Sequence, residues 1–108
     1  MSEKIVTVII DRPLGSVHPK HPNIVYPVNY GYIAGTVAGD GEEEDVYILG
    51  VDHPVSTFTG QLIAKLHRQA DVEDTWVAAP RGMTFTEDEI RAAVHFQEQY
   101  FHTDIRLL

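Results

Sequence analysis

Carboxylates gather in one short stretch of this chain, Asp40-Gly-Glu-Glu-Glu-Asp45, directly before the apolar run Val46-Tyr-Ile-Leu49. Acidic side chains this close together repel one another unless a cation lies among them. Clusters of carboxylate oxygens suit hard divalent cations, above all Mg²⁺, which keeps several waters and often also binds substrate phosphates. The alternative is a solvated acidic turn between two strands, and the run alone leaves both interpretations open.

A second acidic group, Asp71-Val-Glu-Asp74, also lies at the mouth of a strand-like segment. A pair of metal ions about 3.5–4 Å apart needs ligands from more than one segment. Two acidic clusters at strand ends therefore favour a shared metal site. The alternative for this second group is a polar turn.

Three tyrosines precede the acidic run, at Tyr26, Tyr30 and Tyr32, around Asn29. A tyrosine hydroxyl donates a hydrogen bond without adding charge, which suits phosphate oxygens. Packing of the rings in a small barrel, with their hydroxyls at the surface, is the alternative.

Two histidines, His18 and His21, flank Lys20 in a proline-rich loop. Their spacing allows a transition-metal pair, but exposed loop histidines are more common, and both interpretations stay open. His67-Arg68 lies beside the second acidic group, where it could contact phosphate.

Composition limits the classes of protein that the chain can represent. At 108 residues we expect one domain, residues 1–108. The net charge of −8 argues against nucleic acid and membrane surfaces as partners. The absence of cysteine excludes disulfides and thiolate chemistry. With no apolar stretch near the roughly 20 residues of a transmembrane helix and no signal peptide, we expect a cytoplasmic protein.

The hydrophobic pattern predicts several short strands followed by one helix. Thr86-Glu-Asp-Glu89 forms a capping box that begins an amphipathic helix over about 87–101. Strands are expected at 4–11, 45–51, 61–67 and 74–79, with an extended segment at 24–37 and loops at 12–23 and 52–60. This order predicts a mainly β protein with a C-terminal helix (α+β), built as a closed or nearly closed barrel.

Taken together, these residues resemble the soluble family I inorganic pyrophosphatases. Tyr26-Pro-Val-Asn-Tyr-Gly-Tyr-Ile33, Thr36 and Asp40-x-Glu42-x-x-Asp45 are similar to the family's Tyr-Pro-x-Asn-Tyr-Gly-Tyr segment and the Asp-x-Asp-x-x-Asp signature that follows it without gaps. The group at 71–74 resembles the family's later acidic pair, and residues 95–100 resemble its C-terminal helix. The likeness runs from about Ile5 to Tyr100, which is nearly the whole chain.

The resemblance implies an OB-like five-stranded barrel, Mg²⁺ dependence, hydrolysis of inorganic pyrophosphate to two phosphates, and a homo-oligomer. It implies Glu42 and Asp45 as catalytic residues, with Glu42 orienting or deprotonating the attacking water. Phosphate would be bound by Lys20, Tyr30 and Tyr100. The implied metal ligands are Asp40, Glu42, Asp45, Asp71 and Asp74.

The chain departs from the family pattern mainly in its positive charges. Glu42 replaces an aspartate, and the stretch between Lys20 and Tyr26 is too short for the strand pair and arginine that the family has there. Two expected lysines are replaced, one by Thr75-Trp76 and the other by Phe101. Positive charge at the site would then come from Arg12, Lys65 or Arg68.

Because of these departures from the family pattern, two other functions remain open. One is hydrolysis of a larger phosphoanhydride or of another phosphate ester. The other is a protein that binds a metal or a phosphorylated ligand without turnover.

Overall fold

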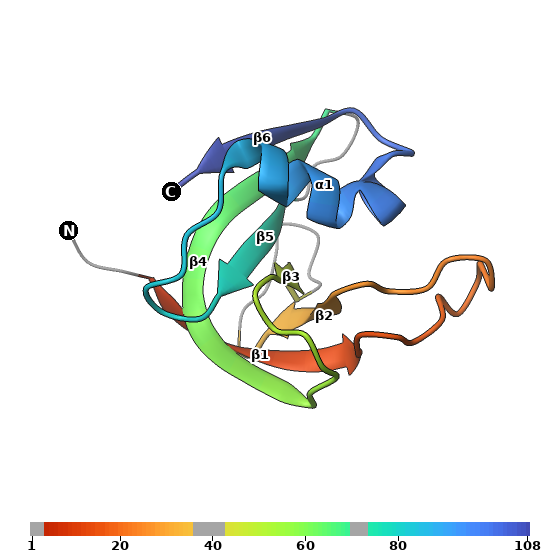
Figure 1. Ribbon diagram of the computed structural model, residues 1–108, viewed down its shortest axis with the longest axis horizontal. Helices are drawn as coiled ribbons and strands as arrows, with labels where there is room; N and C mark the ends of the chain where they lie inside the picture. Colours follow the sequence, from red (N-terminus) through yellow and green to blue (C-terminus); the bar gives the residue numbers. More distant parts are fainter. Residues whose placement is uncertain (1–3, 36–42, 70–73) are drawn as a thin grey trace.

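The computed structural model describes residues 4–35, 43–69 and 74–108 (Figure 1). Within these ranges the chain forms six strands and one helix, in the order β1 (Ile5–Arg12), β2 (Asn29–Ile33), β3 (Asp45–Ile48), β4 (Thr57–Arg68), β5 (Asp74–Ala79), α1 (Glu87–Glu98) and β6 (Thr103–Leu107).

The strands close into a small barrel. Their order is β1-β2-β3-β5-β4-β6, and an additional β1–β4 pairing joins the first five strands into a ring, leaving β6 outside it on β4. All neighbours are antiparallel except β3 and β5, which run parallel. The predicted mainly β, OB-like five-stranded barrel with a C-terminal helix is therefore confirmed.

Strand β4 is the long strand that makes closure possible. Its first residues pair with β1, its later ones pair with β5 and β6, and its register shifts between Leu62 and Ala64. It curves around the barrel in Figure 1, as expected for a strand with a local bulge. Strand formation begins at Thr57, so the prediction of a turn-rich connection over 52–60 was wrong for its last residues.

Alternation along the strands sorts apolar side chains into two clusters. Val8, Val46 and Ile48 belong to a cluster on one face of the sheet. Tyr47 and Leu66, among others, belong to a second cluster that packs under α1. The pocket described below lies on the α1 side.

The capping box predicted for the helix is present, with Thr86 and Glu89 exchanging hydrogen bonds. Ile90 and Val94 are buried against the barrel. The helix ends at Glu98, so its predicted extension to 101 was wrong. The N–H of Phe101 bonds the Glu98 carbonyl in a tighter turn, and this turn directs the chain into β6.

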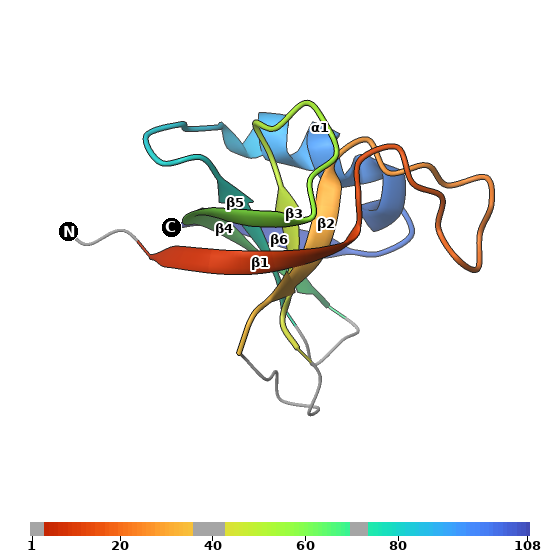
Figure 2. The ribbon, with the colours of Figure 1, turned by 90° about the horizontal axis from the view of Figure 1, so that it is seen from below.

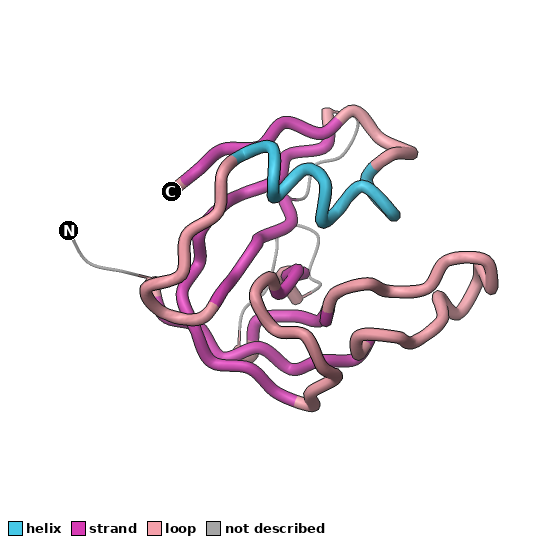
Figure 3. Tube along the Cα trace, viewed as in Figure 1, coloured by secondary structure: helices cyan, strands magenta, loops and turns pink. Residues whose placement is uncertain are grey.

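A long excursion joins β1 to β2 and projects from the barrel in Figures 1 and 3. We call residues 13–28 the projecting segment. Val17 and Val25 form a bridge within it. Its base is held by buried Asn29, whose Oδ1 accepts from Leu14 N–H at 2.9 Å and from Val55 N–H at 3.2 Å. Asn29 thereby fixes the segment to the barrel.

Figure 2 shows α1 lying across one end of the barrel, on the same side as the base of the projecting segment. The end of α1 and this segment thus face each other across the open end. Within the described ranges no helix is both long and apolar enough to cross a membrane.

The close approach of β1 and β2 at Gly31 predicts that adding a side chain there strongly destabilises the fold. A Cβ there would overlap the Ile9 carbonyl oxygen, which is backbone and cannot move aside. We expect Gly31→Ala to lower the free energy of unfolding by about 3 kcal/mol or more, measured by urea denaturation.

Gly35→Ala is the matched control. A Cβ at Gly35 meets nothing within 4 Å, but the backbone is left-handed, with φ of 77°. The expected cost is therefore only about 1–2 kcal/mol. Equal losses in the two variants would contradict the close-approach argument.

Candidate functional site

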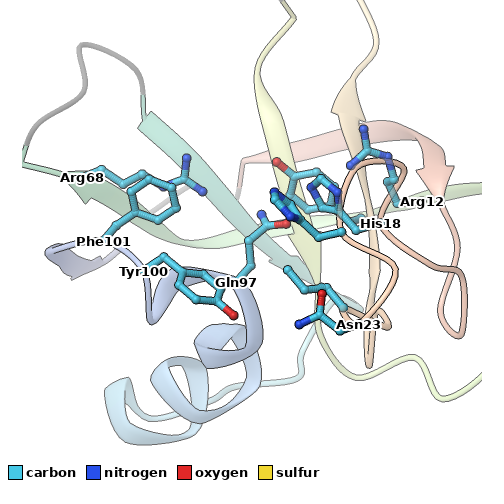
Figure 4. A pocket seen from close by; sticks show the side chains of 10 residues that line it. Arg12, His18, Asn23, Arg68, Gln97, Tyr100 and Phe101 are labelled. Atoms are coloured by element: carbon cyan, nitrogen blue, oxygen red, sulfur yellow. The ribbon is translucent and has the colours of Figure 1, made fainter.

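A pocket of about 430 Å³ lies between the projecting segment and the end of α1 (Figure 4). Arg68, Tyr100 and Phe101 lie on one side of it, and Arg12, His18 and Asn23 on the other, with Gln97 between them. The remaining lining residues are His21, Ile24 and Tyr30.

The pocket brings together four of the five side chains for which phosphate contacts were predicted, namely Arg12, Tyr30, Arg68 and Tyr100. They come from β1, β2, β4 and the turn after α1. Lys20 belongs to the projecting segment but does not line the pocket. The phosphate-binding roles of all five remain predictions.

A series of directional hydrogen bonds starts at the lining residue Arg12 and includes a second lining residue, Gln97. Arg12 Nη1 donates to the Tyr26 hydroxyl at 2.8 Å, and that hydroxyl donates to Gln97 Oε1 at 2.9 Å. Gln97 Nε2 then donates to the Tyr47 hydroxyl at 2.7 Å. The Tyr47 hydroxyl donates to Glu98 Oε2 at 2.6 Å.

This series of hydrogen bonds ends in a largely buried ion pair between Arg68 and Glu98. Arg68 Nε donates to Glu98 Oε1 at 3.0 Å and Arg68 Nη2 to Oε2 at 2.5 Å, so the pair is bidentate. The Thr103 hydroxyl adds a bond to Oε1 at 2.8 Å, and the Arg68 guanidinium lies 4.1 Å from the centre of the Phe101 ring. Together these contacts hold Arg68 at one wall of the pocket.

The carboxyl of Glu98 is ionised in spite of its burial. Burial raises its pKa, but the hydrogen bonds from Arg68 and Tyr47 outweigh this effect and hold the pKa below its usual range. The ionised carboxylate in turn balances the charge of Arg68.

Asp45 begins β3, and its carboxylate accepts a hydrogen bond from the Tyr30 hydroxyl. Burial and the nearby charge of Asp11 raise the pKa of Asp45, although Tyr30, Arg68 and Arg12 oppose the shift. Burial also raises the pKa of Tyr30, so this hydroxyl stays protonated and remains a donor. A half-buried carboxylate whose pKa is raised in this way would be stabilised by a cation beside it.

Asp74 lies on the other face of the sheet. Its carboxylate bonds His67 Nδ1 at 2.8 Å and Lys65 Nζ at 3.2 Å. Burial acts to raise its pKa, but these two partners outweigh the effect and lower it. In β5 the buried Val77 packs in the cluster under α1, so alternation turns Asp74 away from that side. The structure therefore does not bring Asp74 together with Asp45.

Lys65 lies on the same face as Asp74, and its ammonium also lies 5.1 Å from the centre of the Trp76 ring. Of the three cations expected to replace missing family lysines and arginine, only Arg12 and Arg68 line the pocket.

The remaining predicted ligands, Asp40, Glu42 and Asp71, lie outside the described residues. Among the residues that are described, no group of three His, Cys, Asp or Glu side chains is placed to hold a metal ion. The acidic groups nearest to the pocket are Asp45, which bonds the lining residue Tyr30, and Asp11, whose charge acts on Asp45. Both are carboxylates, and this chemistry fits a hard cation such as Mg²⁺.

Sequence reasoning missed the role of Gln97 and Glu98. The sequence pattern placed both residues in the expected helix and assigned neither of them a functional role. The one available signal was that both polar residues follow buried Val94 on the inward-turning side of a short helix. Their partners, Tyr47 and Arg68, are respectively 50 and 30 positions distant in sequence, so the pairing could not be deduced.

Comparison with known proteins finds similar structures but no similar sequences. A scan against protein-family models found no match, and a search of curated proteins found none either. Among solved structures, an inorganic pyrophosphatase from Ehrlichia chaffeensis matches with a TM-score of 0.73 and 20% identity, over 96% of this chain and 86% of that one. One from Coxiella burnetii matches with a TM-score of 0.65 and 19% identity, over 99% and 86%.

A third, from Neisseria gonorrhoeae, has a TM-score of 0.64 and 21% identity, over 91% of this chain and 74% of that one. The chain therefore has the fold class of the OB-like barrels. In particular, it has the fold of these inorganic pyrophosphatases over most of its length, and the resemblance inferred from the motifs is confirmed at the level of structure.

The ion pair at Glu98 predicts how stability depends on pH. Because the folded-state pKa is depressed, its stabilisation is present above the unfolded value of about 4.5 and is lost as pH falls through the lower folded value. Glu98→Gln should flatten the acid limb of the stability profile in that window. At pH 7 it should cost about 2–3 kcal/mol, because Arg68 loses the charged partner of its bidentate hydrogen bonds while a little solvent still reaches it.

The control is Glu87→Gln, which removes an exposed ion pair with Arg91 on the same helix. That change should cost no more than about 0.5 kcal/mol. Urea denaturation at pH values from 3 to 7 measures both variants. An unchanged acid limb in Glu98→Gln would rule out the buried pair as its source.

Proposed function

We propose that the protein hydrolyses inorganic pyrophosphate to two phosphates in a metal-dependent reaction. The observation that supports this most is the convergence of Arg12, Tyr30, Arg68 and Tyr100 on one pocket beside the Asp45 carboxylate. The fold shared with inorganic pyrophosphatases supports the same reaction class.

The resident metal that we propose is Mg²⁺, held by Asp45 with Asp40, Glu42 and Asp71. Bound there, it would lower the pKa of a coordinated water and neutralise substrate phosphates. The raised pKa of Asp45, caused by burial and by Asp11, supports a cation at this carboxylate. Asp74 was also predicted as a ligand, and that prediction stays open beside its bonds to His67 and Lys65.

Substrate binding and positioning are assigned to side chains of the protein. Arg12 and Arg68 face the pocket from opposite walls and bind phosphate oxygens, which concentrates positive charge within a protein of net charge −8. Tyr100 donates its hydroxyl from the rim. Tyr30 holds the Asp45 carboxylate in place, and Glu42 orients or deprotonates the attacking water.

A homo-oligomeric state and a cytoplasmic location, which the resemblance and the composition suggested, stay predictions.

Phosphate release from pyrophosphate, with and without Mg²⁺, tests this proposal. We expect turnover only with the metal, and a loss of about 100-fold or more in Asp45→Asn. Asp74→Asn is the matched control, because Asp74 faces away from the pocket, and it should stay within a few-fold of wild type.

Equal loss in both variants would support Asp74 as a metal ligand, as the resemblance implies. No metal-dependent turnover by the wild-type protein would reject the proposal.

A second candidate function is hydrolysis of a larger phosphoanhydride or phosphate ester. The pocket volume of about 430 Å³ falls within the roughly 300–1,000 Å³ typical of sites for organic ligands. Ile24 and Phe101 add apolar surface to its lining, beyond what two phosphates require.

A substrate panel separates the two candidates. With Mg²⁺ present, pyrophosphate, tripolyphosphate and nucleoside di- and triphosphates are compared by kcat/KM. Preference for pyrophosphate supports the first candidate, and a preference of tenfold or more for nucleotides supports the second. Calorimetric binding without turnover of any of them would instead indicate the non-catalytic alternative.

A further inference from the structure

The projecting segment contributes two imidazoles to the pocket. The rings of His18 and His21 lie 4.9 Å apart and both line the pocket. Figure 4 shows His18 on the side opposite Tyr100 and Phe101. The His18 ring also lies nearly parallel to that of buried Tyr26, at 6.2 Å between centroids and 9° between planes. His18 therefore has a fixed place in the pocket wall.

One nitrogen of His18 is already occupied. The backbone N–H of Lys20 donates to His18 Nδ1 at 3.1 Å, so Nδ1 acts as an acceptor and carries no proton. In the neutral ring the proton then lies on Nε2. Nε2–H is the donor that remains available to a ligand.

The surroundings of His18 disfavour a second proton on the ring. Burial, and then the positive charges of Arg12, His21 and Lys20, lower its pKa. Tyr26 packs against it, and the groups across the pocket are Gln97, Tyr100 and Arg68. Within the described ranges, no carboxylate contributes to the shift in the opposite direction.

This arrangement fits an anion better than a metal ion. A cation at His18 would be repelled by Arg12 and Lys20, and Nδ1 is taken. Within the described part of the chain, no third histidine or acidic ligand completes a metal group. A neutral N–H beside an arginine suits a phosphate oxygen.

We infer that His18 is a substrate-binding residue that donates Nε2–H, as a neutral imidazole, to a phosphate oxygen of the substrate. This inference rests on the function proposed above and deepens it. His18 supplies a phosphate contact from the projecting segment without adding charge.

Two substitutions at His18 test whether the Nε2 donor, rather than the ring as a whole, binds the phosphate. In His18→Gln the side-chain amide nitrogen reaches the position of Nε2 and keeps a donor. In His18→Asn the shorter amide can still accept from Lys20 N–H but does not reach the pocket. Calorimetry measures the affinity of each protein for methylenediphosphonate, whose P–C–P linkage resists hydrolysis, in the presence of Mg²⁺.

We expect His18→Asn to bind the analogue about 10- to 100-fold more weakly, as for loss of a hydrogen bond to a charged group, and His18→Gln to stay within about threefold of wild type. In ¹⁵N spectra of the wild-type complex, Nε2 should be protonated and Nδ1 should not. Amide spectra of the free variants verify that both are folded.

Equal affinity of wild type and His18→Asn overturns the inference, as does a doubly protonated His18 in the complex. If the wild-type protein binds the analogue with the expected dependence on His18 yet releases no phosphate from pyrophosphate, the proposed hydrolysis fails while the role of His18 stands.

Discussion

The site depends on the buried ion pair between Arg68 and Glu98. It joins the end of β4 to the end of α1, and the Thr103 hydroxyl extends it to β6. Because breaking a bidentate ion pair that is largely removed from solvent is costly, this pair fixes where the helix ends relative to the barrel. Through Tyr47 and Gln97 the same bonds continue toward Arg12, so the two arginines of the pocket are held by one connected set of hydrogen bonds.

The pocket lining is positively charged, although the protein as a whole is negatively charged. The net charge of −8 would repel a phosphate, yet the described pocket lining contains Arg12 and Arg68 and no carboxylate. Asp45 lies beside it with its pKa raised by burial and by Asp11. An anionic substrate accompanied by a divalent cation matches both features, because the cation satisfies the carboxylates and the arginines meet the phosphates.

Local patterns in the sequence were sufficient for much of the fold. β1 and β5 are strongly β-branched or apolar, and the capping box marks the start of α1, so these elements were found nearly where they lie. β6 was missed because Thr103–Leu107 is short and partly charged, and it becomes a strand only by pairing with β4. The helix end was misplaced for a related reason, since that pairing ends the helix at Glu98.

The sequence by itself determined the barrel class and the candidate chemistry, because strand alternation, the capping box and the spacing from Tyr30 to Asp45 are local features. Only the tertiary structure decided which of these side chains meet. It placed Asp74 beside Lys65 on the face opposite α1, paired Glu98 with Arg68 and brought His18 to the pocket. Those outcomes depend on strand register and on the path of the projecting segment, which arise from contacts between residues far apart in the chain.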